Sequence, residues 1–309
     1  MRKHPTITRR GLLALGGCAL ARAAADDDKL FRFNSGESVI EVAFTPAEFD
    51  VSAPAIMAWI STAARAVAAY YGKFPVPKVS VAIRQVPARG GVLSGTTFGG
   101  ENPRTRMSLG QHVTPGELDD DWTMTHEFVH LGFPGMRRQH HWLEEGQATY
   151  IEPIARAQIG ALRLERVWGD VVRDMHQGQP GQNDRGLDFT HTWGRTYWGG
   201  AIYCLLADVQ IRERTGNRAG LQQALRGVNA AGGNIEYDWS IEEALAAADA
   251  AVKTPVMTEL YNQMKDKPYA PDLTELWQRL GVEVSEGKVR FHDDAPLASV
   301  RKAITTPLR

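Results

Sequence analysis

The residues best suited to chemistry lie between positions 126 and 150, which read HEFVHLGFPGMRRQHHWLEEGQATY. His126 and His130 are four residues apart, so on a helix both imidazoles project from one face. Two imidazoles arranged in this way can bind one zinc ion from the same side. Glu127 would then lie beside the open coordination position, where its carboxylate can take a proton from a zinc-bound water. The spacing predicts a catalytic zinc site.

A catalytic zinc site uses three protein ligands and leaves the fourth position to water, so a third ligand is expected downstream. Glu145 is the best candidate, because it lies near the start of a second helical segment, WLEEGQATYIEPIARA. The first helix has clear ends, with acidic residues 119–121 before it and Gly132 and Pro134 after it. The alternative is a helix that carries two surface histidines by chance, and these helix signals favour the metal site.

HEFVH followed by WLEEGQATY resembles the gluzincin metallopeptidases, in which the third zinc ligand is a glutamate directly before glycine. The aminopeptidase N and glycyl aminopeptidase families are the most similar. The resemblance implies that Glu145, which precedes Gly146, is the third ligand. Those families separate the second histidine from this glutamate by about eighteen residues or more, against fourteen here. This shorter connection leaves His140 and His141 as alternative ligands.

Two further segments extend the resemblance. Residues 197–200 resemble the Y-x-K-G segment of the aminopeptidases, which implies that Tyr197 donates a hydrogen bond to the oxyanion of the tetrahedral intermediate. Gly199 replaces the lysine, and packing of Tyr197 on the zinc helix is the alternative. Residues 99–102 resemble G-x-M-E-N, whose glutamate pairs with the free amine of the substrate. This segment lacks the methionine and is one residue short, so Glu101 is only a weak candidate for substrate binding beside an ordinary turn.

The segment 178–194 is polar and rich in glycine, and loops of this length are uncommon unless they are functional or mobile. It could overhang the cleft. His191 is a weak candidate for substrate binding there, and Asp188 is a second polar residue of interest. For both residues, an ordinary place in the loop is the favoured alternative.

The elements before the zinc helix suggest a small sheet. Residues 29–50 have strand character, 53–71 show helical spacing, and strands are predicted at 79–83 and 105–109. The glycine-rich stretch GGVLSGTTFGGENPR between these strands is predicted to be a loop. The resemblance implies that the last strand before the zinc helix is the sheet edge along which a peptide lies.

The rest of the chain is predicted to be mainly helical. Helical segments follow to about residue 176, over 196–228, 242–252 and 256–265, and from 272, with a weak strand at 289–291. The expected fold is α+β, and the resemblance to the gluzincins implies a thermolysin-like catalytic domain, with a small N-terminal mixed β-sheet packed on a mostly helical C-terminal part. We expect an N-terminal α/β subdomain at 26–120 and a helical zinc-binding subdomain at 121–309, which together form one catalytic unit.

Composition excludes a nucleic-acid surface, because 35 Lys and Arg residues balance 36 Asp and Glu residues without a basic stripe. With 309 residues, of which 43% are hydrophobic, the chain can bury one large core or two modest ones. Cys204 lies in an apolar run and is expected to be a buried small hydrophobe. The chain has two cysteines, Cys18 in the N-terminal segment and Cys204. If the N-terminal segment is removed, Cys204 has no partner, so no disulfide is expected.

Residues 1–25 have the pattern of an export signal. Basic residues precede an apolar run that is too short to span a bilayer, and Ala23–Ala25 follow. Thr8-Arg9-Arg10 resembles a twin-arginine signal. The expected product is periplasmic or secreted. LGGC, ending at Cys18, resembles a lipoprotein cleavage box, which makes a membrane-tethered product the alternative.

The sequence thus predicts an exported metallopeptidase with one Zn²⁺ per chain. His126, His130 and Glu145 are the expected ligands, and a peptide or protein is the expected substrate. Glu127 would be the general base and Tyr197 the oxyanion stabiliser. The alternative is a non-catalytic zinc-binding protein, either a periplasmic scaffold or a binding module tethered to the membrane.

Overall fold

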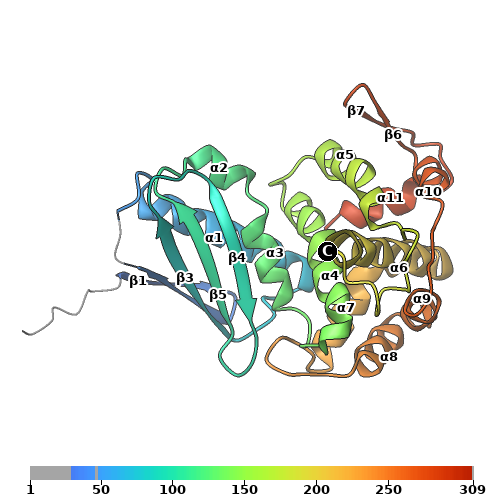
Figure 1. The fold of residues 1–309 in the computed structure, drawn as a ribbon, viewed down its shortest axis with the longest axis horizontal. Helices are drawn as coiled ribbons and strands as arrows, with labels where there is room; N and C mark the ends of the chain where they lie inside the picture. The colour runs from blue at the N-terminus through green and yellow to red at the C-terminus, as the bar shows by residue number, and fades with distance from the viewer. Residues whose placement is uncertain (1–28, 46–47, 308–309) are drawn as a thin grey trace, which may run out of the picture.

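The molecule has two halves (Figure 1). A β-sheet with one long helix forms one half, and a group of helices forms the other. This computed structural model describes residues 29–45 and 48–307. The predicted export signal at 1–25, including Cys18, lies outside these residues. No helix among the residues described combines the length and apolar character that a membrane span requires.

The sheet contains five strands and is mixed. Its spatial order is β1 (Lys29–Ser35), β2 (Ser38–Phe44), β3 (Lys78–Val86), β5 (Arg104–Gly110) and β4 (Val92–Phe98). β2, β3 and β5 run parallel, while the two outer strands β1 and β4 are antiparallel to their neighbours. The mixed sheet and the many helices confirm the predicted α+β class.

The edge strand nearest the helical half is not the one that the sequence predicted. β5, which covers the predicted strand at 105–109, pairs with β3 on one side and β4 on the other. The edge is β4, which lies inside the glycine-rich stretch predicted to be a loop. That prediction was wrong because Gly95 and the flanking glycines disguise a seven-residue strand.

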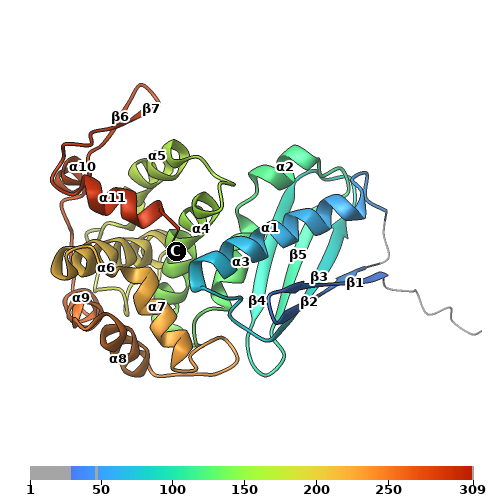
Figure 2. The ribbon, with the colours of Figure 1, turned by 180° about the vertical axis from the view of Figure 1, so that it is seen from behind.

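Helix α1 (Ala53–Tyr71) packs across one face of the sheet, as Figure 2 shows from behind. It connects the parallel strands β2 and β3, as a crossover helix should. Ile56, Ile60 and Val67 on its inner face are fully buried. Gly72 ends the helix with φ = +86°, a left-handed conformation that glycine adopts without a steric cost. The predicted helix at 53–71 is confirmed.

Helix α2 (Pro115–Asp120) lies on the sheet side of the molecule, and α3 (Thr123–His130) leads from there to α4 (His141–Gln158) and α5 (Leu164–Asp174) of the helical half (Figure 1). A π-helical turn η3 (Arg195–Gly199) then leads into α6 (Gly200–Thr215) and α7 (Leu221–Ala230). The last elements are α8 (Ile241–Val252), α9 (Val256–Met264), α10 (Leu273–Leu280), the hairpin β6 (Val282–Ser285) and β7 (Lys288–Phe291), and α11 (Ala298–Thr305). The predicted helical segment at 196–228 is therefore divided into three elements.

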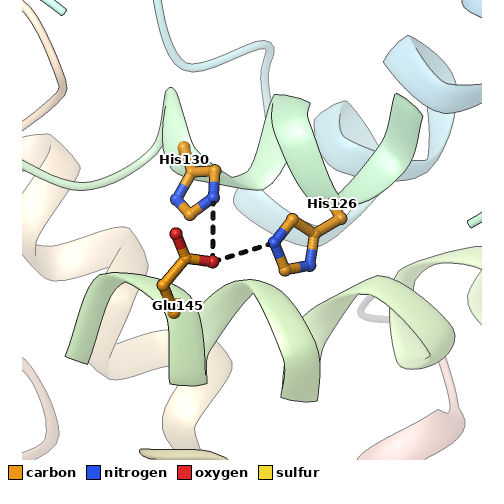
Figure 3. Close-up of side chains that lie close together, drawn as sticks. All are labelled: His126, His130 and Glu145. Carbon is orange, nitrogen blue, oxygen red and sulfur yellow. Dashed lines mark hydrogen bonds and ion pairs between the residues drawn. The ribbon is translucent and has the colours of Figure 1, made fainter. Parts of the chain in front are cut away.

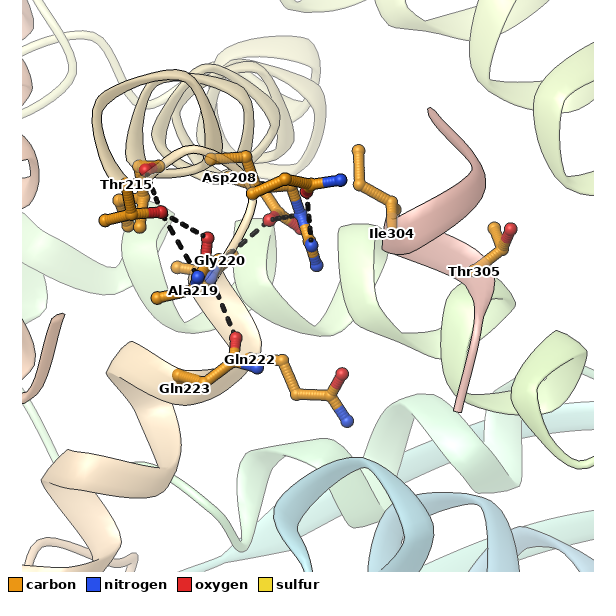
Figure 4. A network of polar contacts seen from close by, with 12 residues as sticks. Asp208, Thr215, Ala219, Gly220, Gln222, Gln223, Ile304 and Thr305 are labelled. Atoms are coloured by element: carbon orange, nitrogen blue, oxygen red, sulfur yellow. Dashed lines mark hydrogen bonds and ion pairs between the residues drawn. The ribbon is translucent and has the colours of Figure 1, made fainter. Parts of the chain in front are cut away.

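A buried polar network joins α6 and α7 (Figure 4), and Tyr150 extends it to α4. The carboxylate of Asp208 accepts hydrogen bonds from the Arg212 guanidinium at 2.7 Å, the Leu221 main-chain N–H at 3.0 Å and the Tyr150 hydroxyl at 3.1 Å. Asp208 and Arg212 are both almost fully buried, so each compensates the charge of the other. Because Tyr150 belongs to α4, the network fixes the helix of Glu145 against the helix that follows Tyr197. Cys204 is buried in α6, as predicted.

Candidate metal centre

His126, His130 and Glu145 converge between α3 and α4 (Figure 3). Nε2 of His126 lies 3.1 Å from Oε2 of Glu145, and Nε2 of His130 lies 3.6 Å from the same oxygen. One potential ligand atom from each residue lies within 4.8 Å of the others. Two imidazole nitrogens and one carboxylate oxygen form the donor set of a catalytic zinc site that keeps one position open.

The local sequence explains this geometry. The carboxylate of Asp121 accepts the main-chain N–H of Met124 at 3.0 Å and so caps the first turn of α3. His126 and His130 then face one side, with ring centroids 5.0 Å apart. On the facing helix, Gly146 contacts Gly200 so closely that a Cβ atom at either position would overlap the opposite backbone. This contact places Glu145, the neighbour of Gly146, beside the histidines.

The charges at the site suit a metal cation. Burial lowers the pKa of His130 to about 4, so its imidazole is neutral near pH 7 and keeps a lone pair for a ligand. Burial alone would raise the pKa of Glu145, but His126 and His130 outweigh this and hold it below its usual value. Glu145 is therefore an anion that faces two imidazoles in a buried site. The residues present fit a bound Zn²⁺.

Glu127 lies in the same cleft and its side chain is buried against strand β4. Burial raises the pKa of its carboxyl group, and the neighbouring His126 and Thr97 oppose this effect. A carboxylate whose pKa is moved toward neutrality is better suited to accept a proton and to release it again.

Tyr197 reaches the cleft from the π-helical turn η3. Such turns occur often at functional sites. Its ring stacks on His126 with centroids 6.3 Å apart and on Trp193 at 5.7 Å. Burial, followed by the charges of Glu145 and Glu127, raises the pKa of Tyr197 to about 12, so the phenol keeps its proton at neutral pH and can donate it in a hydrogen bond.

His140 and His141, the alternative ligands, lie differently. Nδ1 of His140 is 3.0 Å from Asp188 in a buried cluster with Trp142 and Tyr261, away from the convergent group. His141 lines the cleft, with Nε2 3.3 Å from Oε1 of Glu145 and Nδ1 3.0 Å from Glu144. The group with metal-site geometry among the described residues contains neither histidine.

The cleft has a volume of about 570 Å³ and is bordered by β4 on one side and by α3 and α4 on the other. Glu101 and His191, the two weak candidates for substrate binding, are both exposed, and neither is among the described residues that line it. Glu101 lies in the turn between β4 and β5, and His191 precedes η3. Asp188 holds the buried cluster of His140, Trp142 and Tyr261 together.

The sequence prediction missed the residues of β4 that border the cleft, notably Gly95 and Thr97. A signal was present, because Thr96 and Thr97 are β-branched and one glycine inside a strand often marks a close backbone approach. The surrounding glycines obscured this pattern.

No protein-family model matches the chain, and no curated protein does. Among solved structures, the chain is similar to an aminopeptidase N family protein from Idiomarina loihiensis, with a TM-score of 0.60 and 14% identity over 84% of this chain and 50% of that one. It is also similar to a variant M1 zinc metallopeptidase from Deinococcus radiodurans bound to a Tyr-Ser-Ala substrate. That match has a TM-score of 0.51 and 14% identity over 79% of this chain and 53% of the other.

These matches show a fold shared with M1 peptidase domains, and the chain spans about half the length of each structure. The similarity agrees with the family resemblance of the 126–150 segment.

Proposed function

We propose that this chain is a zinc-dependent metallopeptidase of the gluzincin type, with a thermolysin-like catalytic domain. The observation that carries this proposal is the convergence of His126, His130 and Glu145 in a cleft that also contains Glu127. A structural zinc site is closed by four protein ligands and has no use for an additional carboxylate beside them. The buried Glu127 therefore favours catalysis over the alternative of a non-catalytic scaffold.

In this proposal, the metal ligands, Glu127 and Tyr197 each have a separate role in peptide hydrolysis. His126, His130 and Glu145 would hold Zn²⁺, which when bound would lower the pKa of a water molecule to about 7 and polarise the scissile carbonyl. Glu127 accepts the proton of the attacking water and passes a proton to the leaving amine. Tyr197 donates its phenolic hydrogen to the oxyanion, a charge that develops only on the way to the tetrahedral intermediate.

The substrate class follows from the position of β4. This strand pairs on one side with β5, and its other edge borders the cleft. An edge strand offers main-chain N–H and C=O groups to an extended peptide, which can add as a further strand. We infer that the substrate is a peptide or protein segment in extended conformation. Because residues 1–25 have the pattern of an export signal, we propose that the enzyme acts outside the cytoplasm.

The test combines metal analysis of the purified protein with cleavage of a mixed peptide pool. We expect one zinc per chain and hydrolysis of peptide bonds. Glu127→Gln should retain zinc and lose hydrolysis, because it keeps the shape of the side chain and removes the base. His126→Ala should lose the metal.

Three outcomes would contradict the proposal. Full activity of Glu127→Gln would exclude this mechanism, and a protein that binds no zinc would exclude the metal site. One bound zinc with no cleavage of any peptide would favour the scaffold. The positions of the cleaved bonds would distinguish exopeptidase from endopeptidase action.

A further inference from the structure

Strand β4 passes directly over the side chain of Glu127, and glycine at position 95 permits this approach. A Cβ atom at Gly95 would lie 2.5 Å from Cγ of Glu127 and 2.8 Å from its Oε1 atom. Any other residue at position 95 therefore forces the strand or the carboxylate to move. Glycine in a strand interior weakens the strand, because it has no side chain to pack and loses more conformational entropy. Its presence here needs a reason, and the clearance for Glu127 supplies one.

Thr97 holds the main chain of Glu127 from the same strand. Two residues from Gly95, it lies on the same face of β4 and donates its hydroxyl hydrogen to the main-chain oxygen of Glu127 at 3.0 Å. Glu127 belongs to the last turn of α3, where carbonyl groups lack donors within the helix. Thr97 therefore satisfies an acceptor that the short helix leaves open.

A second hydroxyl supports the first. Thr105 on β5 is opposite Thr97 in the strand register, and the two hydroxyl oxygens are 3.0 Å apart. Because the proton of Thr97 is directed at Glu127, Thr105 donates to Thr97. Thr105 is completely buried. The chain of hydrogen bonds thus runs from the interior of the sheet to the main chain of Glu127.

We propose that Gly95 and Thr97 are positioning residues for Glu127, so that the edge strand which borders the cleft also fixes the base. Gly95 leaves the space that the carboxylate occupies, and Thr97 fixes the main chain from which this side chain projects. This inference rests on the proposed peptidase function.

The direction of the Gly95 contact separates this role from substrate binding. Side chains stand roughly perpendicular to a sheet, whereas the N–H and C=O groups that would pair with a peptide lie in its plane. A methyl group at position 95 points at the side chain of Glu127 and out of the plane of the strand edge, so we expect the carboxylate to move rather than the main-chain groups of the edge. It should therefore disturb the base and not the binding of the peptide.

The first test is Gly95→Ala. We expect zinc content to stay at one per chain and kcat on a cleaved peptide to fall on the order of 10²-fold, because small displacements of a catalytic group cost about this much. Binding is measured separately by calorimetry with the same peptide in the inactive Glu127→Gln background. Glu127→Gln and Gly95→Ala/Glu127→Gln should give the same Kd.

Thr97 provides a test that does not depend on how Gly95→Ala folds. Thr97→Val has the same shape without the hydroxyl and should lower kcat with zinc retained. Thr97→Ser keeps the hydroxyl and should restore most of the activity. For Gly95→Ala, the matched control is Gly116→Ala, because a Cβ atom at Gly116 meets no other atom within 4 Å. Its kcat should equal that of the wild type.

The outcomes test the positioning role of Gly95 and Thr97 separately from the proposed peptidase function. Hydrolysis by the wild type with unchanged kcat in Gly95→Ala and Thr97→Val would overturn the positioning role alone. A weaker Kd for Gly95→Ala/Glu127→Gln with a kcat that is otherwise unaffected would assign Gly95 to substrate binding instead. A zinc-loaded wild type that cleaves no peptide would refute the proposed function itself.

Discussion

At the residue scale, the groups around the candidate centre differ in protonation in ways that suit their proposed roles. Glu145, whose pKa is lowered by the histidines, is an anion, as the proposed ligand role requires, and His130 is neutral because burial lowers its pKa. Glu127 has a raised pKa and Tyr197 keeps its proton. A shared cleft thus contains ligands, a base and a hydrogen-bond donor, separated by their surroundings.

The role of Tyr197 leads to a prediction for Tyr197→Phe. The substitution removes one donor aimed at a charge that develops in the transition state, so kcat should fall on the order of 10²- to 10³-fold with little change in KM. Steady-state kinetics on a cleaved peptide measures both constants. Tyr237→Phe is the control, since Tyr237 is exposed and lies outside the cleft. An unchanged kcat in Tyr197→Phe would leave Tyr197 with packing on His126 as its role.

The grouping of the predicted ligands followed from local spacing, whereas their surroundings did not. His126 and His130 share a face because four residues make about one helical turn. Glu145 could be identified from its helical segment and from the glycine that follows it. Gly95 and Thr97 meet Glu127 only through strand pairing and packing, which depend on contacts between residues far apart in sequence.

At the scale of elements, the close contact of α4 with the beginning of α6 sets the geometry of the site. A Cβ atom at Gly200 would lie 2.0 Å from the main-chain oxygen of Trp142 and 2.7 Å from Cα of Gly146. These glycines allow the helix of Glu145 to approach the turn of Tyr197 at backbone distance. Both helices were predicted from the sequence, but the contact between Gly146 and Gly200 was not. The motif accounts for Gly146 only as the neighbour of a ligand.

Gly200→Ala should therefore damage stability and metal binding together. The added methyl group has backbone on the opposite side, which cannot move as a flexible side chain can, so we expect a loss of about 3 kcal/mol in the free energy of unfolding. Zinc affinity should fall because Glu145 is displaced with α4. Urea unfolding and metal titration measure the two effects. The control is Gly181→Ala, where a Cβ atom meets nothing within 4 Å; equal unfolding midpoints for both variants would contradict the argument.

Across the whole molecule, the candidate ligands connect the two halves of the fold. Helix α3, which carries His126 and His130, packs against α4 on one side and against α1, β4 and β5 of the sheet half on the other. Helix α4, which carries Glu145, packs mainly against α6, α3 and η3. The strands of the sheet and the helices of the other half were expected from periodicity, and their arrangement from the family resemblance. Their junction at the candidate centre was not, since it depends on the β4 edge and on the contact between Gly146 and Gly200.

Because a metal bound by His126, His130 and Glu145 would tie α3 to α4, we predict that removal of zinc lowers the stability of the whole fold. A ligand that binds only the native state stabilises it by about 4 kcal/mol at a thousandfold excess over Kd. For a chain of this length, that corresponds to a decrease in Tm of about 7 °C on chelation. Calorimetry with and without chelator measures the shift. Glu127→Gln should show the same decrease, because it keeps all three ligands. His126→Ala should melt near the chelated wild type and respond to neither zinc nor chelator. An equal Tm for the zinc-loaded and zinc-free wild type would show that the metal does not hold the two halves together.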